Sequence, residues 1–295
     1  MDRFTTDLKY NFFGRDIVGR LILINCVVFV FVELVRIFLM LFNVPYNPIA
    51  SYLSLPASFV ALMYQPWSLF TYMFMHAGIL HLLFNMLWLY WFGRLFLNFY
   101  SSKHLRGLYV LGGLCGGLLY MISYNIFPYF EGSVEIATLV GASASVLAIV
   151  VATAVREPKF PVQFMFIGTV RLKYVALFMV LFDLLFMTSS NAGGHIAHLG
   201  GAAAGFWFAM GLAKGTDPTK WINAVLDFFS RGFKMPKRKP KMKVHYGNRQ
   251  QQYDYNARKK ADEDEINRIL EKLRKSGYGS LSEDEKKKLF DASRR

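Results

Sequence analysis

The chain has 295 residues, of which 54% are hydrophobic, 17% aromatic and only 18% charged. So large an apolar share beside so few charges argues against an ordinary soluble domain. The charges are also unevenly placed, because residues 21–213 hold 8 Lys/Arg and 5 Asp/Glu whereas residues 214–295 hold 22 and 12. The composition therefore predicts an apolar membrane core followed by a basic, solvated tail, with a formal net charge of +14 overall.

Six segments are apolar over about the 20 residues that a membrane-spanning helix needs. They are residues 18–42, 79–99, 105–125, 136–155, 172–190 and 193–213. The first is too long for the core of a signal peptide and lacks a small-residue cleavage site, so we expect it to remain as an anchor. The predicted fold is an all-α polytopic membrane protein built as a bundle of six transmembrane helices.

The stretch between the first two predicted spans, residues 43–78, is long and itself apolar. Its Pro, Tyr and Trp content is wrong for a span but suits a segment at headgroup depth, with Trp67 among the interfacial aromatics. We expect a long semi-immersed first loop. A loop that merely rests on the membrane surface is the open alternative.

Basic residues alternate between the connections of the predicted spans. The N-terminal segment, the second and fourth connections and the tail carry Lys or Arg, whereas the first, third and fifth connections carry none. Because positively charged loops stay on the cytoplasmic side, both termini are predicted to be cytoplasmic. Cys26 and Cys115 both fall within spans, so no disulfide is expected.

Polar side chains are costly inside a bilayer, so those within the spans are candidates for function. They gather near the start of the second, fourth and sixth spans, which all enter the membrane from the same, outer face. We therefore expect them to lie at similar depth, roughly 5–15 Å below that surface. The residues are His76, His81 and Asn85, then Gly141, Ser143 and Ser145, and finally His195 and His198.

Small residues repeat every four positions in the same part of the chain. The repeats are Gly112 and Gly116 in the third span, Gly141 and Ser145 in the fourth, and Ala197, Gly201 and Gly205 in the sixth. Such seams let helix backbones approach closely. We expect them to bring the helix face bearing Ser143 within reach of the face bearing His195.

A serine and a histidine at this depth predict acyl-transfer chemistry. A hydroxyl becomes a good nucleophile when a neutral imidazole takes its proton, so we predict Ser143 as the nucleophile and His195 as its base. The backbone N–H of Ser143, the Asn85 amide and the His81 ring are the expected donors to an oxyanion. No carboxylate is expected as a third member. Asp183 is predicted near mid-membrane, as a protonated group bonded to a polar neighbour rather than as a gate.

The motifs resemble those of the rhomboid family of intramembrane serine proteases. The pattern HxxxxHxxxN begins at His76, GxS begins at Gly141, and GHxAHLGG covers residues 194–201. The resemblance extends over about residues 15–213. It implies a rhomboid-like bundle in which Ser143 and His195 form the dyad, His81, Asn85 and the Ser143 N–H stabilise the oxyanion, His76 and Gly141 are accessory, and His198 only packs.

The resemblance also implies a substrate class and a location. Single-span membrane proteins would be cut near the outer leaflet through an acyl-enzyme, with no metal and no cofactor. The chain would be a multi-pass protein of a bacterial inner membrane. The fifth span and the loop 189–194 would form a gate.

One position departs from the family pattern beside the nucleophile. Rhomboids commonly carry glycine after the serine, whereas this chain carries Ala144. We expect its methyl group to lie beside the oxyanion and to narrow the site, without removing any catalytic group.

Beyond the predicted core, residues 1–213, the tail divides into two parts. Residues 214–260 contain KMPKRKPKMK and are predicted to be a basic juxtamembrane linker resting on anionic lipid headgroups, with no nucleic acid as partner. Residues 261–295 are predicted to form two short cytoplasmic helices, joined by a glycine turn at 276–280 and carrying a capping box from Ser282 to Glu285. The segment resembles one found on some bacterial rhomboids, and its partner is unknown.

Three other functions compete with proteolysis. A rhomboid-like protein that binds membrane helices without cutting them is the main alternative, although it would be expected to have lost Ser143 or His195. A metal protein using His76, His81, His195 and His198 lacks a neighbouring carboxylate and an HExxH motif. A transporter would need a site at the bilayer midplane.

Overall fold

The computed structural model describes residues 16–164, 168–232 and 249–293. It divides into two units, residues 1–234 and residues 235–295, and each is described by itself. The basic run KMPKRKPKMK and the N-terminal Arg3, Lys9 and Arg15 lie outside the described residues. The predicted contact of the tail with lipid headgroups therefore stays a prediction.

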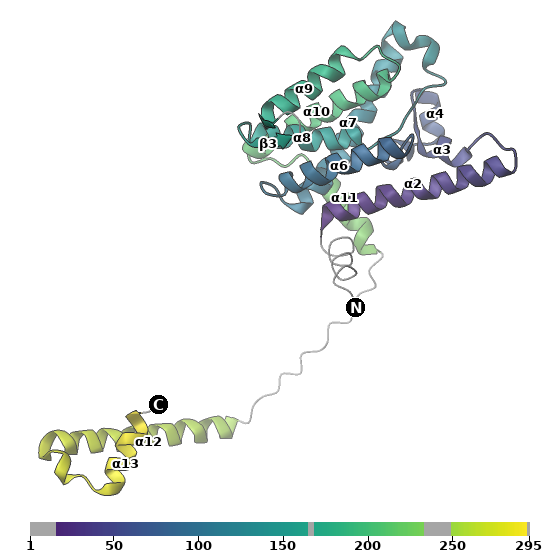
Figure 1. The fold of residues 1–295 in the computed structure, drawn as a ribbon. Coiled ribbons are helices and arrows are strands. Elements are labelled where there is room, and N and C mark those ends of the chain that lie inside the picture. The colour runs from purple at the N-terminus through teal and green to yellow at the C-terminus, as the bar shows by residue number, and fades with distance from the viewer. Residues whose placement is uncertain (1–15, 165–167, 233–248, 294–295) are drawn as a thin grey trace. The chain divides into compact units, whose positions relative to one another are not determined.

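Six helices of the first unit occupy the six predicted spans (Figure 1). They are α2 (Ile17–Leu41), α6 (Ile79–Phe96), α7 (Ser102–Ile126), α8 (Ser143–Arg156), α9 (Leu172–Leu185) and α10 (Ala192–Ala213). Of the described helices, α2, α6, α7 and α10 are long and apolar enough to cross a membrane, while α8 and α9 have 14 residues each. The all-α polytopic membrane fold is confirmed.

Two helix ends differ from the prediction, and both differences move polar residues to helix termini. The fourth span was expected from residue 136, but α8 begins at Ser143 because Thr138–Leu139 form a strand, β2, that pairs antiparallel with β1 (Leu55–Pro56). The fifth span was expected to reach residue 190, but α9 ends at Leu185 and a polar turn, residues 188–191, follows.

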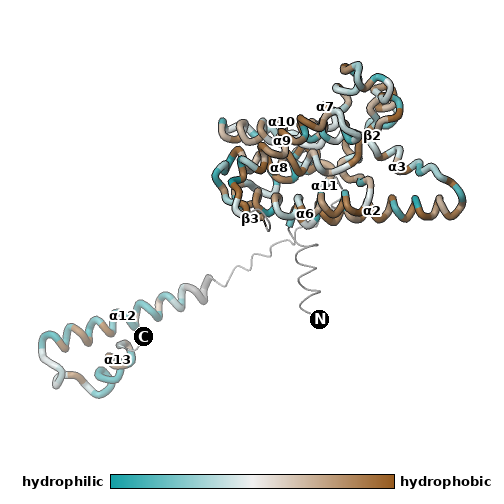
Figure 2. Tube along the Cα trace, turned by 45° about the horizontal axis from the view of Figure 1, so that its top comes forward, coloured by the Kyte–Doolittle hydropathy of each residue, from teal (hydrophilic) through white to brown (hydrophobic). Residues whose placement is uncertain are grey.

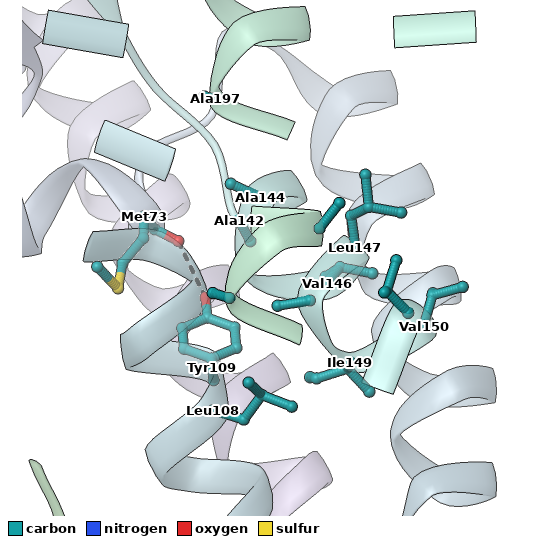
Figure 3. Packing of buried hydrophobic residues seen from close by; sticks show 14 of the residues in the cluster. Met73, Leu108, Tyr109, Ala142, Ala144, Val146, Leu147, Ile149, Val150 and Ala197 are labelled. Carbon is teal, nitrogen blue, oxygen red and sulfur yellow. Dashed lines mark hydrogen bonds between the residues drawn. The ribbon is translucent and has the colours of Figure 1, made fainter. Parts of the chain in front are cut away.

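The centre of the bundle is the close packing of α7, α8 and α10. A Cβ added at Gly201 would collide with the carbonyl oxygen of Ala144, and one at Gly116 would lie 2.7 Å from the Ala144 Cβ. Gly205 approaches the backbone of Ala148 in the same way. The small-residue seams of the third and sixth spans are thus confirmed. Figure 3 shows the core around Ala144, where apolar side chains of α8 point toward the neighbouring helices.

The long first loop is a chain of short helices. These are α3 (Pro48–Leu53), α4 (Phe59–Tyr64), α5 (Ser68–Thr71) and the 3₁₀ helix η1 (Tyr72–Phe74). The Trp67 indole N–H donates to the carbonyl of Tyr52 at 2.8 Å, and the Tyr109 hydroxyl on α7 donates to the carbonyl of Met73 at 2.9 Å (Figure 3). The loop is therefore folded onto the bundle. Its immersion in the bilayer stays a prediction.

Two elements between the helices were not predicted. The 3₁₀ helix η2 (Pro128–Ser133) follows α7. The strands β3 (Pro161–Phe164) and β4 (Gly168–Arg171) form an antiparallel hairpin between α8 and α9.

The stretch predicted as a linker, residues 214–260, contains helix instead of coil. Helix α11 (Lys220–Gly232) belongs to the first unit and packs on the start of α7. The Arg106 guanidinium donates to Asn223 Oδ1 at 2.7 Å and pairs with Asp227 at 2.8 Å. The apolar residues of α11 recur with helical spacing, but the segment was judged by the basic, proline-punctuated run that follows it.

The second unit is a pair of helices, α12 (Arg249–Ser276) and α13 (Glu283–Ser293), joined through the 3₁₀ helix η3 (Tyr278–Ser280). The predicted glycine turn is confirmed, with Gly277 at φ +75°. So is the capping box: the Ser282 N–H donates to the Glu285 carboxylate at 2.7 Å and the Glu285 N–H donates to Ser282 Oγ at 3.3 Å. The first helix is longer than predicted. Figure 2 shows both as largely hydrophilic.

Candidate active site

A cavity of about 280 Å³ lies where α6, α8 and α10 begin. Its polar lining includes the predicted nucleophile, both predicted side-chain oxyanion donors and one of the two histidines of α10: Ser143, His81, Asn85 and His198. Apolar side chains complete it, namely Phe84, Trp88, Val140, Val146, Leu147 and Met179. Asn191 and Gly194, from the predicted gate loop, line it as well.

Ser143 is the first residue of α8, so its own backbone N–H lies at the helix N-terminus. The first four N–H groups of a helix have no partner within the helix, and the helix dipole is positive there. Gly141 reaches this point with φ +132°, a conformation that favours glycine, and its N–H donates to the carbonyl of Tyr72 at 3.0 Å. The chain thus presents Ser143 and a free backbone donor together.

The ring of His81 lies beside this turn. A Cβ added at Gly141 would lie 3.0 Å from His81 Nε2 and 3.5 Å from Ser143 Oγ. The Ala77 N–H donates to His81 Nδ1 at 3.3 Å, which leaves the proton of a neutral ring on Nε2. The Nε2–H therefore faces the neighbourhood of the serine hydroxyl as a donor.

Asn85 lies one helical turn after His81 and lines the same cavity. One of its amide N–H groups donates to the carbonyl of His81 at 2.8 Å. A carboxamide carries two such donors, so the second remains for a ligand in the cavity. The structure thus brings His81, Asn85 and Ser143 together as the sequence predicted.

A carboxylate that the sequence reading excluded from the site lies directly behind the histidines. Asp183 Oδ1 accepts from His195 Nδ1 at 2.8 Å and from His198 Nδ1 at 2.8 Å. The expectation that no carboxylate is placed as a third member was wrong, because α9 ends at Leu185 and Asp183 is in its last turn instead of mid-membrane. Its side chain is 5% exposed, so both bonds are shielded from solvent.

The two histidines of α10 differ in what they face. His198 lines the cavity that holds Ser143, and its side chain is 22% exposed. His195 is not among the residues that line this cavity. Its ring lies against Phe182 of α9 and Phe186 directly after that helix, with centroids 5.9 and 6.0 Å away. His198 was expected only to pack. The structure instead gives it the position beside the cavity that was expected of His195.

No hydrogen bond joins Ser143 Oγ to either imidazole in the described part of the chain. Catalytic hydrogen bonds are often long in a free enzyme and tighten when the substrate binds. With the Asp183 carboxylate accepting from Nδ1, the Nε2 atom of a neutral His198 ring carries the lone pair.

Asp183, His195 and His198 are also of the kinds that bind metals, and their ligand atoms all lie within 4.8 Å of one another. Each Nδ1 is, however, 2.8 Å from the same carboxylate oxygen. Ligands around a tetrahedral zinc ion are roughly 3.3 Å apart, so the spacing is that of hydrogen bonds. The arrangement fits an oriented pair of imidazoles better than a metal centre.

The two remaining predicted residues lie beside the cavity. His76 is buried against His81, with ring centroids 5.2 Å apart. Its ring packs edge-on against the His81 ring, and its accessory role stays a prediction. The Ala144 methyl group is buried against Gly116 of α7 and does not line the cavity. The expected narrowing of the site by Ala144 is therefore not found.

One sequence signal does separate the two histidines. Gly201 is the residue of α10 that touches the backbone just after Ser143. At about 100° per residue, His198 lies about 60° from Gly201 around the helix and His195 about 120°. The histidine nearer the glycine seam is the one nearer α8.

A six-helix bundle with a serine, two histidines and an asparagine around one cavity defines a class: polytopic membrane proteins with a polar site at one end of the bundle. Residues 63–215 match the family model described as Rhomboid domain, which spans half of the chain. The chain belongs to the rhomboid family. Residues 252–295 match a second model, described as a family of unknown function (DUF6576).

A similar protein is RHOMBOID-like protein 12, mitochondrial, of Arabidopsis thaliana. It is 29% identical over 145 residues, which are 46% of this chain and 43% of that protein. The chain thus matches less than half of the relative's length.

Proposed function

We propose that the protein is an intramembrane serine endopeptidase with Ser143 as nucleophile and His198 as base. The observation that supports this most strongly is the shared cavity, into which three helices direct a serine, an imidazole with a free Nε2, and two further donors. Membership of the rhomboid family supports the same reaction class. The assignment of the base replaces His195, which the sequence favoured.

In the proposed reaction, Ser143 Oγ attacks the carbonyl carbon of the scissile peptide while His198 Nε2 takes the hydroxyl proton. The oxyanion receives hydrogen bonds from the Ser143 N–H, the His81 Nε2–H and the Asn85 amide. The intermediate collapses as His198 returns the proton to the leaving amine, which departs and leaves an ester on Ser143. Water then attacks this ester with His198 again as base, and the carboxylic acid product is released.

Asp183 acts as a positioning residue in this proposal. Its hydrogen bond to Nδ1 selects the His198 tautomer with a free Nε2, and its negative charge stabilises the imidazolium that forms when the serine proton is taken. His195 shares the same carboxylate oxygen and holds it in place from the other side.

The substrates we propose are single-span membrane proteins, cut near the outer leaflet. The cavity opens among the first turns of helices that are predicted to enter from that side, and a helical substrate must unwind locally to expose a peptide bond. The alternation of basic connections supports a multi-pass protein with both termini cytoplasmic. The proposed location in a bacterial inner membrane rests only on the resemblance of its motifs and tail to bacterial rhomboids.

The test is cleavage of a model single-span substrate by the purified full chain in detergent. We expect Ser143→Ala and His198→Ala to lose on the order of 10³-fold or more in kcat/KM. The matched control is His195→Ala, which removes the neighbouring imidazole and should retain much more activity. Cleavage that survives Ser143→Ala rejects the protease. If cleavage is lost in His195→Ala but not in His198→Ala, the base is His195. Inhibition of cleavage by a metal chelator would favour a metal protein.

The alternative function is binding of membrane helices without cleavage. It predicts that wild type and Ser143→Ala capture the same single-span protein equally well and that neither cuts it. Loss of product only in the serine variant, with capture retained, decides for the protease.

A further inference from the structure

Helix α11 presents an apolar stripe that nothing else in the described part of the chain covers. Trp221, Val225, Phe228 and Phe229 are 55%, 48%, 74% and 61% exposed. Their spacing of four, three and one residues places them on one side of the helix, at positions i, i+4, i+7 and i+8. The buried residues, among them Ile222 and Asn223, lie on the adjoining side, against the bundle.

The helix is held firmly in this orientation by the start of α7. Arg106 donates to Asn223 Oδ1 through both Nε and Nη2, at 3.0 and 2.7 Å, and pairs with Asp227. Gly107 leaves no room for a side chain, since a Cβ there would lie 2.6 Å from Asn223 Nδ2 and from Thr219 Cβ. The exposed stripe is therefore presented at a fixed height relative to the spans.

That height corresponds to the end of a candidate membrane span. Helix α10 is a candidate span that ends at Ala213, and α11 begins seven residues later, beside the first turns of α7. A Trp- and Phe-rich face at the end of a span matches the residues that settle at headgroup depth. The outward apolar residues of the spans themselves, such as Phe178 at 68%, are exposed in the same way because lipid is their solvent.

The charges at this end favour an anionic leaflet. Lys103, Lys214 and Lys220 are exposed, and within the described ranges none of them forms an ion pair with a carboxylate. The acidic residues nearby are engaged: Asp227 pairs with Arg106, and Asp217 accepts from the N–H and hydroxyl of Thr219 at 2.8 and 2.7 Å. Exposed lysines near an anionic surface attract the protein to it.

We propose that α11 is an interfacial anchor whose stripe Trp221, Val225, Phe228 and Phe229 inserts among anionic lipids at the membrane face where α10 ends. The anchor is independent of the proposed proteolysis. It assigns the segment between the bundle and the second unit a lipid-binding role of its own, carried by a helix instead of by the basic run that follows.

The experiment places a nitroxide on Phe228→Cys and, as the matched control, on Ser230→Cys, which is exposed and lies about 160° from Phe228 around the same helix. Both are made in the full chain with Cys26→Ala and Cys115→Ala, reconstituted in phosphatidylcholine vesicles containing phosphatidylglycerol. We expect the label at 228 to collide with oxygen and to be protected from an aqueous nickel chelate, and the label at 230 to show the reverse.

Equal exposure of both labels to the chelate would overturn the proposal. Protection of the label at 228 from both oxygen and the chelate would also overturn it, because it would show that a protein covers the stripe instead of lipid. A second measurement needs no cysteine: brominated lipid should quench the fluorescence of wild type more than that of Trp221→Phe. Equal quenching contradicts the insertion. Vesicles of phosphatidylcholine alone should raise chelate access at 228 severalfold, and unchanged access would reject the part of the proposal that concerns anionic lipid.

Discussion

The two ends of the bundle use polar groups in opposite ways. Where α6, α8 and α10 begin, His81, Asn85 and His198 each keep a ring nitrogen or an amide hydrogen directed at an open cavity. Where α7 begins and α10 ends, Arg106 is matched with an amide and a carboxylate of α11. A polar group with bonding capacity to spare is expensive in a membrane protein and indicates chemistry, whereas a saturated one indicates architecture.

The strongest test of this contrast is to remove one carboxylate at each end. Asp183→Asn should lower kcat/KM by on the order of 10²–10⁴-fold, because the amide cannot hold both imidazoles in the same tautomer. Asp227→Asn, at the opposite end, should change kcat/KM by less than about twofold, since it touches no reacting group.

The readout for Asp183→Asn must separate positioning from folding. A purely structural role would lower the melting temperature and leave kcat/KM per folded molecule and its pH profile unchanged. We expect the pH profile to move and the melting temperature to change little. Partial recovery in Asp183→Glu would support the carboxylate as the group that matters.

A smaller effect is expected at the seam between α8 and α10. Gly201→Ala puts a methyl group against the carbonyl of Ala144, so α10 must shift away from the nucleophile's helix. Overpacking of this kind costs about 1–3 kcal/mol. Gly132→Ala is the control, because no atom lies within 4 Å of the added Cβ there. Thermal unfolding in detergent should show a drop for the first variant only.

Loosening the opposite end should affect stability locally and leave cleavage intact. Arg106→Ala removes the clamp on α11, at a cost of about 1 kcal/mol, since Arg106 and Asp227 are 26% and 30% exposed and partly screened by water. Hydrogen exchange in residues 220–232 should become faster. Arg156→Ala, whose pairing with Glu157 at 4.0 Å is exposed, should change nothing. A loss of cleavage in Arg106→Ala would contradict the separation of the two ends.

The smallest effect belongs to the second unit. The hydrogen bond from Lys272 and the N–H of Ser282 lower the pKa of Glu285 from its ordinary value of 4.5. Because the folded pKa is the lower one, the stabilisation is present above pH 4.5 and is lost as the pH falls through the folded pKa. Hydrogen exchange of α13 should therefore accelerate on acidification. Glu285→Gln should remove most of that dependence without altering cleavage.

Much of the fold followed from hydropathy, because an apolar run of span length has few other uses. The positions of all six bundle helices were predicted, as was the meeting of Ser143 with His81 and Asn85. Asp183 was misjudged because the end of α9 was placed five residues too late. His198 was misjudged because its angle around α10 from Gly201 was not compared with that of His195. Hydropathy indicates which segments lie in the bilayer but not where a helix ends in a turn. The depth of a residue near a helix end was therefore uncertain.

In the tail, the helices were predicted less well than the local capping motif. Helix α11 was missed although its apolar residues recur with helical spacing, because the whole of residues 214–260 was judged by its basic, proline-punctuated run. The length of α12 escaped because a charged helix carries no apolar period. In contrast, the capping box of Ser282 and Glu285 was found, since its signal is entirely local.

The short pairing of β1 with β2 couples the first loop to the segment that leads into Ser143. The N–H of Ala57 donates to Ala137, and Gly141, two residues before Ser143, is tied to Tyr72. A molecule that pushes residues 55–57 aside must either break these bonds or drag the strand before the serine with it. A displacement of the first loop is thus transmitted to the position of the Ser143 side chain.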